Sequence, residues 1–326
     1  MDAMEDHPVS PVEVSVIIPT YNRSAVLRDC VDSVLKSDFN PLEVIVVDNA
    51  STDDTETVCM RCYGTEMKRG RVHYVRLSEN RNAAGGRNAG LTYAKGRYLL
   101  FLDSDNVVDP AMVGILVRAL DVHPAVGLVA PLSIQARSGV IWTLGADYDF
   151  WTSRPINLHE NERPETVHML EAYPTRYSPN AVMVTRAAVD RGQAFDPFYG
   201  VMYEEADFGF RITSPMVPGL ICPRAKTLHM GAIGNEQALA LRRLGIETPE
   251  RTYCFARNRS VFMRRFAPWY GQLSFFLVFI HVFTIYYCWI AFRNKRSDIA
   301  WAYFKGAFRG LYLAFFHMPP LPLAIK

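Results

Sequence analysis

Short apolar runs alternate with segments of helical periodicity through the first 130 residues. The run at residues 14–19 is rich in β-branched side chains, as in a strand buried on both faces of a sheet. Apolar residues from Leu27 to Leu35 then recur with the spacing of one helix face. The predicted strands lie at residues 14–19, 42–47, 72–77, 98–102 and 126–131, and the helices follow at 27–35, after 51–54, at 83–94 and after Asp109-Pro110. This repetition predicts right-handed βαβ units, and so an α/β fold with a doubly wound, mostly parallel sheet.

The pattern changes twice after residue 131. Residues 132–225 contain more proline, aromatic and turn residues, and we interpret them as mixed strands and helices that complete the same domain. Residues 266–292 then contain no Asp, Glu, Lys or Arg, and basic residues stand on both sides. We therefore expect an N-terminal arm at 1–13, one α/β domain at 14–265 and a hydrophobic or amphipathic helical tail at 266–326.

The tail is long and apolar enough to meet a membrane. Residues 273–292 would extend about 30 Å as a helix, which matches the hydrocarbon thickness of a bilayer. The alternative is a helix that lies in the membrane plane or inside the globular domain. A weakly polar stripe indicates a face packed on protein, and it consists of Ser274, His281, Thr284 and Cys288. Residues 299–316 place charges on one face and aromatic residues elsewhere, as in a helix at a membrane surface.

The charge distribution supports a membrane partner. The chain has 35 basic and 33 acidic residues in total, but residues 251–326 hold eleven basic side chains and one acid. The tail is therefore about +10 and the rest about −8, which favours anionic phospholipid over nucleic acid as its partner. Six cysteines without regular spacing do not predict disulfides. The N-terminus has no apolar signal segment, so we expect the catalytic domain on the cytoplasmic face of a membrane.

Polar clusters follow three of the predicted strands. They are Pro19-Thr-Tyr-Asn-Arg23, Asp48-Asn-Ala-Ser-Thr52 and Asp103-Ser-Asp105. Ligands of doubly wound sheets bind beyond the carboxyl ends of the strands, which is where these clusters should meet. Because Asp109 is expected to cap the next helix, Asp103 and Asp105 have no capping role. Two such carboxylates repel each other unless a cation lies between them, and Mg²⁺ or Mn²⁺ would suit both the carboxylates and phosphate oxygens.

Four motifs occur in order along the first half of the chain. They are Val16-Ile-Ile-Pro-Thr-Tyr-Asn-Arg23, Val46-Val-Asp-Asn-Ala-Ser-Thr-Asp-Asp-Thr55, Asn80-x4-Gly85-Gly-Arg-Asn-Ala-Gly90 and Leu99-Leu-Phe-Leu-Asp-Ser-Asp105. Residues 14–265 thereby resemble the family 2 glycosyltransferases of the GT-A (nucleotide-diphospho-sugar transferase) fold, in their rhamnosyltransferase-like subgroup. The resemblance implies a nucleotide-binding half at 14–131 and an acceptor-side half at 132–265.

The same resemblance implies roles for residues at the donor site. Thr20 and Tyr21 would flank the base of a nucleotide sugar, and Asp48 would accept a hydrogen bond from it. Arg87 and Asn88 match a family position near the donor. Asp103 and Asp105 would be the DxD pair that binds metal and diphosphate.

Further residues would complete the site. An acidic segment at residues 195–211 resembles that of the family, and mapping gives Glu205 as general base, with Glu204 and Asp207 as alternatives. We expect Asp207 and Arg211 to form a structural pair at i, i+4. His229 would complete the metal shell or touch the diphosphate. Residues 257–259 resemble a segment near the donor phosphates or lipid headgroups, and the sequence does not choose between them.

The predicted activity is inverting, metal-dependent transfer of a sugar from a UDP- or dTDP-type donor to a hydroxyl acceptor. A membrane tail favours a lipid-linked acceptor in cell-surface glycan assembly. Two alternatives stay open: a polyprenyl-phosphate sugar synthase, for which Glu205 would be dispensable, and a non-catalytic, membrane-anchored sugar-nucleotide binder. A sugar-1-phosphate nucleotidylyltransferase is disfavoured because residues 19–23 lack glycine. The sequence leaves open the sugar, the linkage, the metal and whether the chain forms a homo-oligomer.

Overall fold

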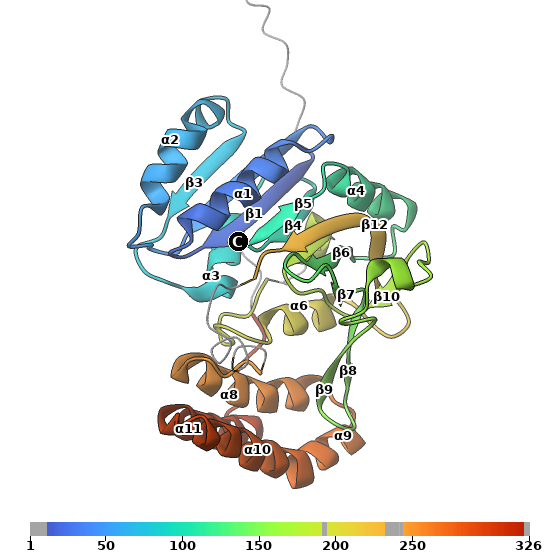
Figure 1. The fold of residues 1–326 in the computed structure, drawn as a ribbon. Helices are drawn as coiled ribbons and strands as arrows, with labels where there is room; N and C mark the ends of the chain where they lie inside the picture. The colour runs from blue at the N-terminus through green and yellow to red at the C-terminus, as the bar shows by residue number, and fades with distance from the viewer. Residues whose placement is uncertain (1–11, 191–193, 232–240, 242–243, 323–326) are drawn as a thin grey trace, which may run out of the picture.

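The computed structural model describes residues 12–190, 194–231, 241 and 244–322. Its core is a ten-stranded sheet, in which eight strands follow the order β10-β12-β6-β11-β4-β1-β2-β3, with β5 paired to β12 and β7 to β6 (Figure 1). The strands are β1 (Val14–Thr20), β2 (Leu42–Asp48), β3 (Val72–Arg76), β4 (Tyr98–Leu102), β5 (Asn106–Val108), β6 (Leu128–Gln135), β7 (Ile141–Thr143), β10 (Tyr173–Thr175), β11 (Ala181–Thr185) and β12 (Gly219–His229). The predicted arm at 1–13 lies almost wholly outside the described residues.

Helices cover both faces of the sheet, which confirms the doubly wound prediction. Alternate residues of β1 point into two different cores, with Val16 on one face and Ile17 on the other. The first core is completed by α1 (Ser24–Leu35), α2 (Thr55–Lys68) and α4 (Met112–Val122), and the second by α3 (Asn82–Leu91), α5 (Arg186–Asp190) and α6 (Glu204–Ile212).

The two halves of the sheet differ in strand direction. β1, β2, β3 and β4 pair in parallel, so their carboxyl ends share one edge. β11 then joins antiparallel to β4 and to β6, while β12 pairs in parallel with β6. This mixture agrees with the interpretation of residues 132–225. A separate hairpin of β8 (Ala146–Asp149) and β9 (Arg154–Asn157) extends from this half toward the C-terminal helices (Figure 1).

The C-terminal helices form a layer below the sheet. It comprises α8 (Pro249–Phe266), α9 (Trp269–Ser274), the π-helical turn η2 (Phe275–Phe279), α10 (Ile280–Arg293) and α11 (Ser297–Phe316). Figure 1 shows α6 between the sheet and α8, with α10 and α11 farthest from the sheet. The continuous helix Trp269–Arg293 is long and apolar enough to cross a membrane, and 22% of its most apolar window is buried.

Some helix and strand boundaries differ from those predicted. α4 begins at Met112 because Asp109 accepts a hydrogen bond from the Ala111 amide in a turn before the helix. The sequence did not predict the short strand β5, which ends at Val108, just before that turn. The polar stripe of the tail is only partly packed: the Ser274 hydroxyl and the Cys288 thiol donate to main-chain carbonyls, whereas His281 is exposed.

Candidate functional site

The carboxyl ends of β1 and β2 lie side by side at the sheet edge. Thr20 pairs in register with Asp48, and its carbonyl accepts a hydrogen bond from the Asn49 amide. Thr20 is buried, and its hydroxyl has no partner among the residues that the structure describes, whereas Tyr21 is exposed. The two predicted base-flanking residues are therefore adjacent, and Tyr21 presents its ring to solvent.

Asp48 is fully buried and tied to its own sheet. One carboxylate oxygen accepts from the Tyr74 hydroxyl at 2.5 Å and from Arg76 at 2.9 Å, and the other accepts from the Ser51 amide at 2.8 Å. Tyr74 and Arg76 lie two residues apart on β3, so both point to the same face beside Asp48. These bonds fix the shape of the edge where a base is predicted to bind.

The two carboxylate oxygens of Asp105 differ in their contacts. Its Oδ2 accepts from Arg23 at 2.8 Å and lies 3.6 Å from His229 Nε2, while its buried Oδ1 has no hydrogen-bond partner among the described residues. Burial raises the pKa of the Asp105 carboxyl, but His229 and Arg23 stabilise the ionised form more strongly and bring the pKa to about 2. Asp105 is therefore a carboxylate at neutral pH. The His229 ring stacks on Trp142 with centroids 4.1 Å apart, which fixes its orientation.

Arg87 joins the other acidic residues of the site. Its Nη2 lies 2.6 Å from Asp103 and 2.5 Å from Glu205, and its Nη1 lies 3.6 Å from Glu204. The guanidinium is buried, and within the described ranges its Nε and Nη1 have no hydrogen-bond partner. One positive charge thus faces three carboxyl groups.

Glu205 is the acidic residue of α6 that is best placed to react. Its side chain is 21% exposed, compared with 8% for Glu204 and 0% for Asp207. Burial, opposed by Arg87 and assisted by the carboxyls of Asp103 and Glu204, brings the pKa of Glu205 to about 8. A carboxyl with this pKa suits proton transfer near neutral pH. Asp207 instead binds Arg211 at 2.8 Å, which is the predicted i, i+4 pair, and also Arg265 at 2.7 Å.

The loop before α6 is held by side chains of α8. Asn258 donates to the carbonyls of Tyr199, Val201 and Met202, at 2.9, 3.0 and 2.8 Å. Arg257 donates to the Phe198 carbonyl at 2.7 Å. In the structure this segment therefore contacts the chain itself, which neither of the sequence-based options for residues 257–259 included.

Arg259 is buried in the same region, beneath α6. Its Nε donates to the Tyr203 hydroxyl at 3.0 Å, and its guanidinium lies 4.4 Å from the centroid of the Phe255 ring and 4.3 Å from that of Phe283. Aromatic faces stabilise a cation in such a position. Arg259 thus links the residue that precedes Glu204 and Glu205 to helix α10.

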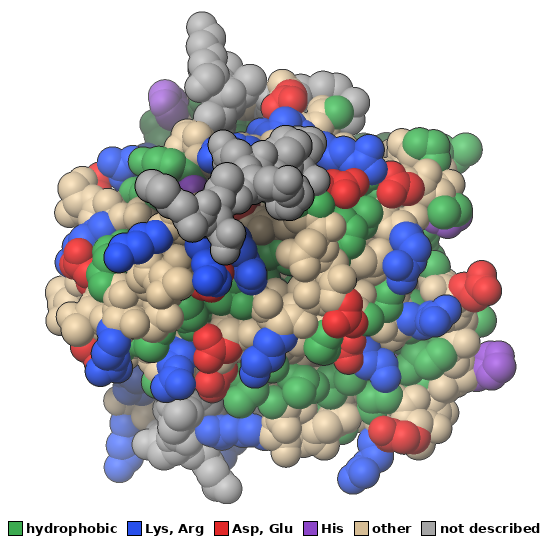
Figure 2. Space-filling model, turned by 90° about the horizontal axis from the view of Figure 1, so that it is seen from above, with side chains coloured by type: hydrophobic (Ala, Val, Ile, Leu, Met, Phe, Trp, Pro, Cys, Tyr) green, Lys and Arg blue, Asp and Glu red, His purple; other side chains and the backbone are tan. Residues whose placement is uncertain are grey.

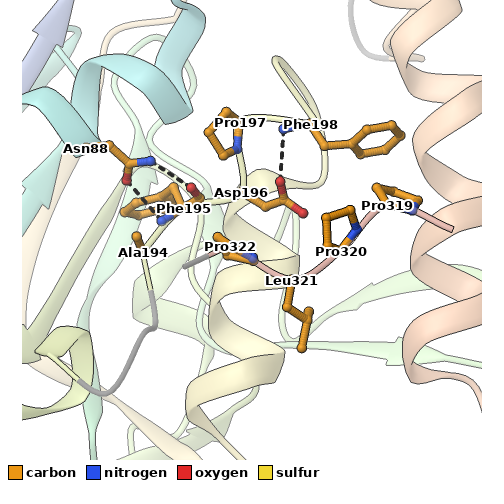
Figure 3. Close-up of a pocket in the computed structure, with 10 residues that line it drawn as sticks. All are labelled: Asn88, Ala194, Phe195, Asp196, Pro197, Phe198, Pro319, Pro320, Leu321 and Pro322. Atoms are coloured by element: carbon orange, nitrogen blue, oxygen red, sulfur yellow. Dashed lines mark hydrogen bonds between the residues drawn. The ribbon is translucent and has the colours of Figure 1, made fainter. Parts of the chain in front are cut away.

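Asn88 connects α3 to the acidic segment. Its side-chain amide donates to the Phe195 carbonyl at 2.7 Å, and its oxygen accepts from the Phe195 amide at 3.0 Å. Both bonds are drawn in Figure 3, at one end of a pocket of about 400 Å³ whose other wall is the C-terminal segment 319–322. Of the predicted site residues, Asn88 alone lines this pocket. The donor role of Asn88 stays a prediction.

The predicted metal ligands do not form a complete set of protein ligands among the described residues. Among the described residues, no group of three or more His, Cys, Asp or Glu side chains could hold an ion by itself. The Asp105 oxygen, which has no partner among the described residues, nevertheless fits a divalent ion that takes its remaining ligands from a diphosphate. Sequence reasoning assigned no role to Arg23 and did not identify Trp142. Arg23 ends the first of the four motifs and so could have been predicted, whereas no sequence pattern marks Trp142 as a site residue.

Comparison with known proteins identifies the family. The sequence model of the protein family described as glycosyl transferase family 2 matches residues 15–184, just over half of the chain. The chain belongs to glycosyl transferase family 2. The matched segment of this family 2 chain contains β1 to β4 and the Asp103-Ser-Asp105 motif, so the resemblance that the sequence motifs indicated is confirmed.

Curated relatives match a part of the chain. One is the putative teichuronic acid biosynthesis glycosyltransferase TuaG of Bacillus subtilis, 44% identical over 93 residues, which are 28% of this chain and 36% of TuaG. Another is the UDP-Glc:alpha-D-GlcNAc-diphosphoundecaprenol beta-1,3-glucosyltransferase WfaP of Escherichia coli, 38% identical over 28% of this chain and 35% of WfaP. The alignments thus span about a third of each relative.

The fold agrees with solved structures of GT-A proteins. The crystal structure of GalNAc-T7 with UDP, GalNAc and Mn²⁺ superposes with a TM-score of 0.58 at 16% identity, covering 95% of this chain and 59% of that one. This likeness shows the fold. The family 2 chain therefore has a GT-A fold and an apolar C-terminal helix.

Proposed function

We propose that this family 2 chain is an inverting, metal-dependent glycosyltransferase that moves a sugar from a UDP- or dTDP-type donor to a hydroxyl acceptor. The observation that carries the proposal is the arrangement around Arg87. One buried guanidinium contacts both Asp103, at the end of β4, and Glu205, at the start of α6. It therefore joins the predicted diphosphate side of the site to the predicted base.

In this proposal the donor lies along the carboxyl edge of the sheet. Thr20, Tyr21 and Asp48 are assigned to the nucleoside, and Arg87 and Asn88 to the neighbourhood of the diphosphate. Asp105, with Asp103 and His229, would hold Mg²⁺ or Mn²⁺. The bound ion would supply positive charge to the leaving diphosphate. The unpartnered Oδ1 of Asp105 supports this assignment, and GalNAc-T7 was solved with UDP and Mn²⁺.

Glu205 is assigned the role of general base. Its carboxylate takes the proton of the acceptor hydroxyl while that oxygen bonds to the anomeric carbon. The bond from that carbon to the diphosphate oxygen breaks in the same step, and its electron pair leaves with the nucleoside diphosphate. Attack opposite the leaving group inverts the anomeric configuration. The partial exposure of Glu205 and its pKa of about 8 support this assignment.

The acceptor is proposed to be lipid-linked and the protein to be attached to the cytoplasmic face of a membrane, in cell-surface glycan assembly. WfaP is named for a diphosphoundecaprenol acceptor. The helix Trp269–Arg293 has the length and composition needed for a membrane, and the basic tail suits anionic lipid. The apolar helix and the basic tail both favour an acceptor presented at the bilayer surface.

A donor-binding panel tests the proposal. Detergent-solubilised wild-type protein is titrated with UDP-, dTDP- and GDP-sugars in the presence of Mn²⁺, Mg²⁺ or a chelator. We expect one donor class to bind with metal, and we expect Asp105→Ala to lose the metal-dependent part. Asp121→Ala is a matched control, because Asp121 lies in α4 and its carboxylate accepts from Arg97 and Tyr98, away from the site. Failure of every donor to bind under all metals would overturn the proposal.

A further inference from the structure

The outer face of α10 is apolar and uncovered. Val278, at the end of η2, begins a row of large apolar side chains that continues through α10 with spacings of three and four residues. The others are Val282, Ile285, Trp289 and Phe292, and all five are about half exposed or more. This spacing marks a single face of a helix. The face therefore runs along the helix from one end to the other.

Helix α11 continues the same kind of surface. Its outward residues are Trp301, Phe304, Phe308, Tyr312 and Phe315, of which Phe308 is 70% exposed. Its inward residues are small where it crosses α8: a Cβ on Gly306 would lie 2.4 Å from the Tyr253 carbonyl oxygen, and one on Gly310 would lie 2.8 Å from that of Arg257. α11 therefore packs closely on α8 and turns these five aromatic residues outward.

The inner face of α10 is built into the protein. Ile280, Phe283 and Ala291 of α10 and Phe275 of η2 are buried in a cluster with residues of α8 and α11. Phe283 also covers the guanidinium of Arg259, whose Nη1 has no hydrogen-bond partner in the part of the chain that the structure describes. If α10 left this position to cross a bilayer, the apolar surface of α8 and α11 would face water and Arg259 would lose an aromatic partner. This packing opposes a spanning orientation.

Basic side chains accompany the outward aromatic residues. The guanidinium of Arg293 lies 4.9 Å from the Trp289 ring, Lys305 lies 5.1 Å from Trp301, and Arg309 lies 5.1 Å from Tyr312. From residue 266 to 322 the chain has one acidic residue, Asp298, and Arg296 pairs with it at 2.7 Å. Aromatic rings with adjacent cations suit the headgroup region of an anionic bilayer.

The opposite face of the molecule has a different character. Figure 2 views the molecule from above, the side farthest from α10 and α11 in Figure 1, and shows basic and acidic side chains interspersed there. We propose that the outer face of α10 and α11 is an in-plane docking surface for an anionic bilayer, with both helices parallel to the membrane and neither crossing it. This inference rests on the proposed membrane attachment and specifies its geometry.

Depth measurements along α10 test the orientation. Single cysteines replace Val278, Ile285 or Phe292 in full-length protein that also carries Cys62→Ser, because Cys62 is the native cysteine assigned as exposed. Each is spin-labelled on vesicles of phosphatidylcholine with phosphatidylglycerol, and its depth is measured by collision with oxygen and a nickel chelate. The first and last positions are fourteen residues, or about 21 Å, apart along a helix. We expect three equal, shallow depths. Depths that change steadily across the bilayer would overturn the in-plane geometry.

Vesicle binding tests the chemistry of the surface. The double variant Lys305→Glu with Arg309→Glu should bind phosphatidylglycerol vesicles at least about tenfold more weakly than wild type. The matched control reverses Arg61 and Lys68, two exposed basic residues of α2, and should bind as wild type does. Equal binding by both variants would overturn the proposal, as would a lipid-free dimer in light scattering that buries the labelled positions. Donor binding in detergent is measured in parallel, so a failure here is distinguished from failure of the catalytic assignment.

Discussion

The side chain of Asn258 gives the sharpest prediction about how the site is held. Asn258 is fully buried on α8, and its amide donates to three carbonyls in the loop before α6. That loop ends in Met202 and Tyr203, with φ of 69° and 74°. Left-handed backbone costs a residue with a side chain about 1–2 kcal/mol. The loop is therefore strained immediately before Glu204.

The hydrogen bonds of Asn258 and the backbone strain of the loop have energies of similar size. The amide has two hydrogens to share among the three carbonyls, which contribute about 2 kcal/mol at roughly 1 kcal/mol for each hydrogen bond. The strain of two left-handed residues is about 2–4 kcal/mol. Asn258→Ala removes the hydrogen bonds that hold the left-handed backbone of Met202 and Tyr203. The loop should then relax to a less strained conformation and move Glu205. A displacement of about 1 Å at a reacting group costs up to about 100-fold in rate.

We expect Asn258→Ala to lose up to about 2 kcal/mol of unfolding free energy in urea, because relief of strain offsets part of the lost hydrogen bonding. We also expect a loss of at least about tenfold in kcat, with little change in donor KM. Val113→Ala is the matched control, because it removes buried apolar volume from α4, in the core on the opposite face of the sheet from α6, at a similar cost in stability. It should keep its kcat. If the two variants show equal kcat at equal stability loss, the reasoning about the loop is refuted.

Three further predictions concern Glu205, Gly310 and Trp142. Because Glu205 must be deprotonated to accept a proton and its pKa is raised to about 8, kcat/KM should rise with pH and level off above about 8; a profile that is flat from pH 6 to 9 would contradict this. Gly310→Ala should lower the unfolding free energy by about 1–3 kcal/mol, because its Cβ meets the main chain of α8, and unchanged thermal stability would contradict the close packing. Trp142→Ala should weaken Mn²⁺-dependent donor binding by freeing the His229 ring, whereas binding without metal should be unchanged.

The strand ends were predictable because their signals are local. The buried strands are continuous β-branched runs, and in a parallel sheet such runs bring Thr20, Asp48 and Asp103 to one edge whatever the rest of the chain does. The assignment of Glu205 depended on the family resemblance, and the geometry adds its exposure and its contact with Arg87.

Other features depend on contacts between distant parts of the chain. Arg257 and Asn258 bind carbonyls 56 to 59 residues away, and main-chain acceptors leave no mark in the sequence. The tail was ambiguous for a different reason. Both faces of α10 are apolar, one against protein and one outward, so hydropathy does not distinguish a spanning helix from one that lies between protein and lipid.

The central claim is that Glu205 activates the acceptor in a single displacement, and the most direct test compares Glu205→Gln with Glu204→Gln. Donor affinity and sugar transfer to a lipid-linked hydroxyl acceptor are measured for both, and the anomeric configuration of the wild-type product is determined by NMR. We predict that Glu205→Gln binds the donor and loses transfer by at least about 100-fold, that Glu204→Gln keeps most of its transfer, and that the product is inverted. Full transfer to this hydroxyl acceptor by Glu205→Gln would contradict the account, because another group would then have to take the proton of the acceptor.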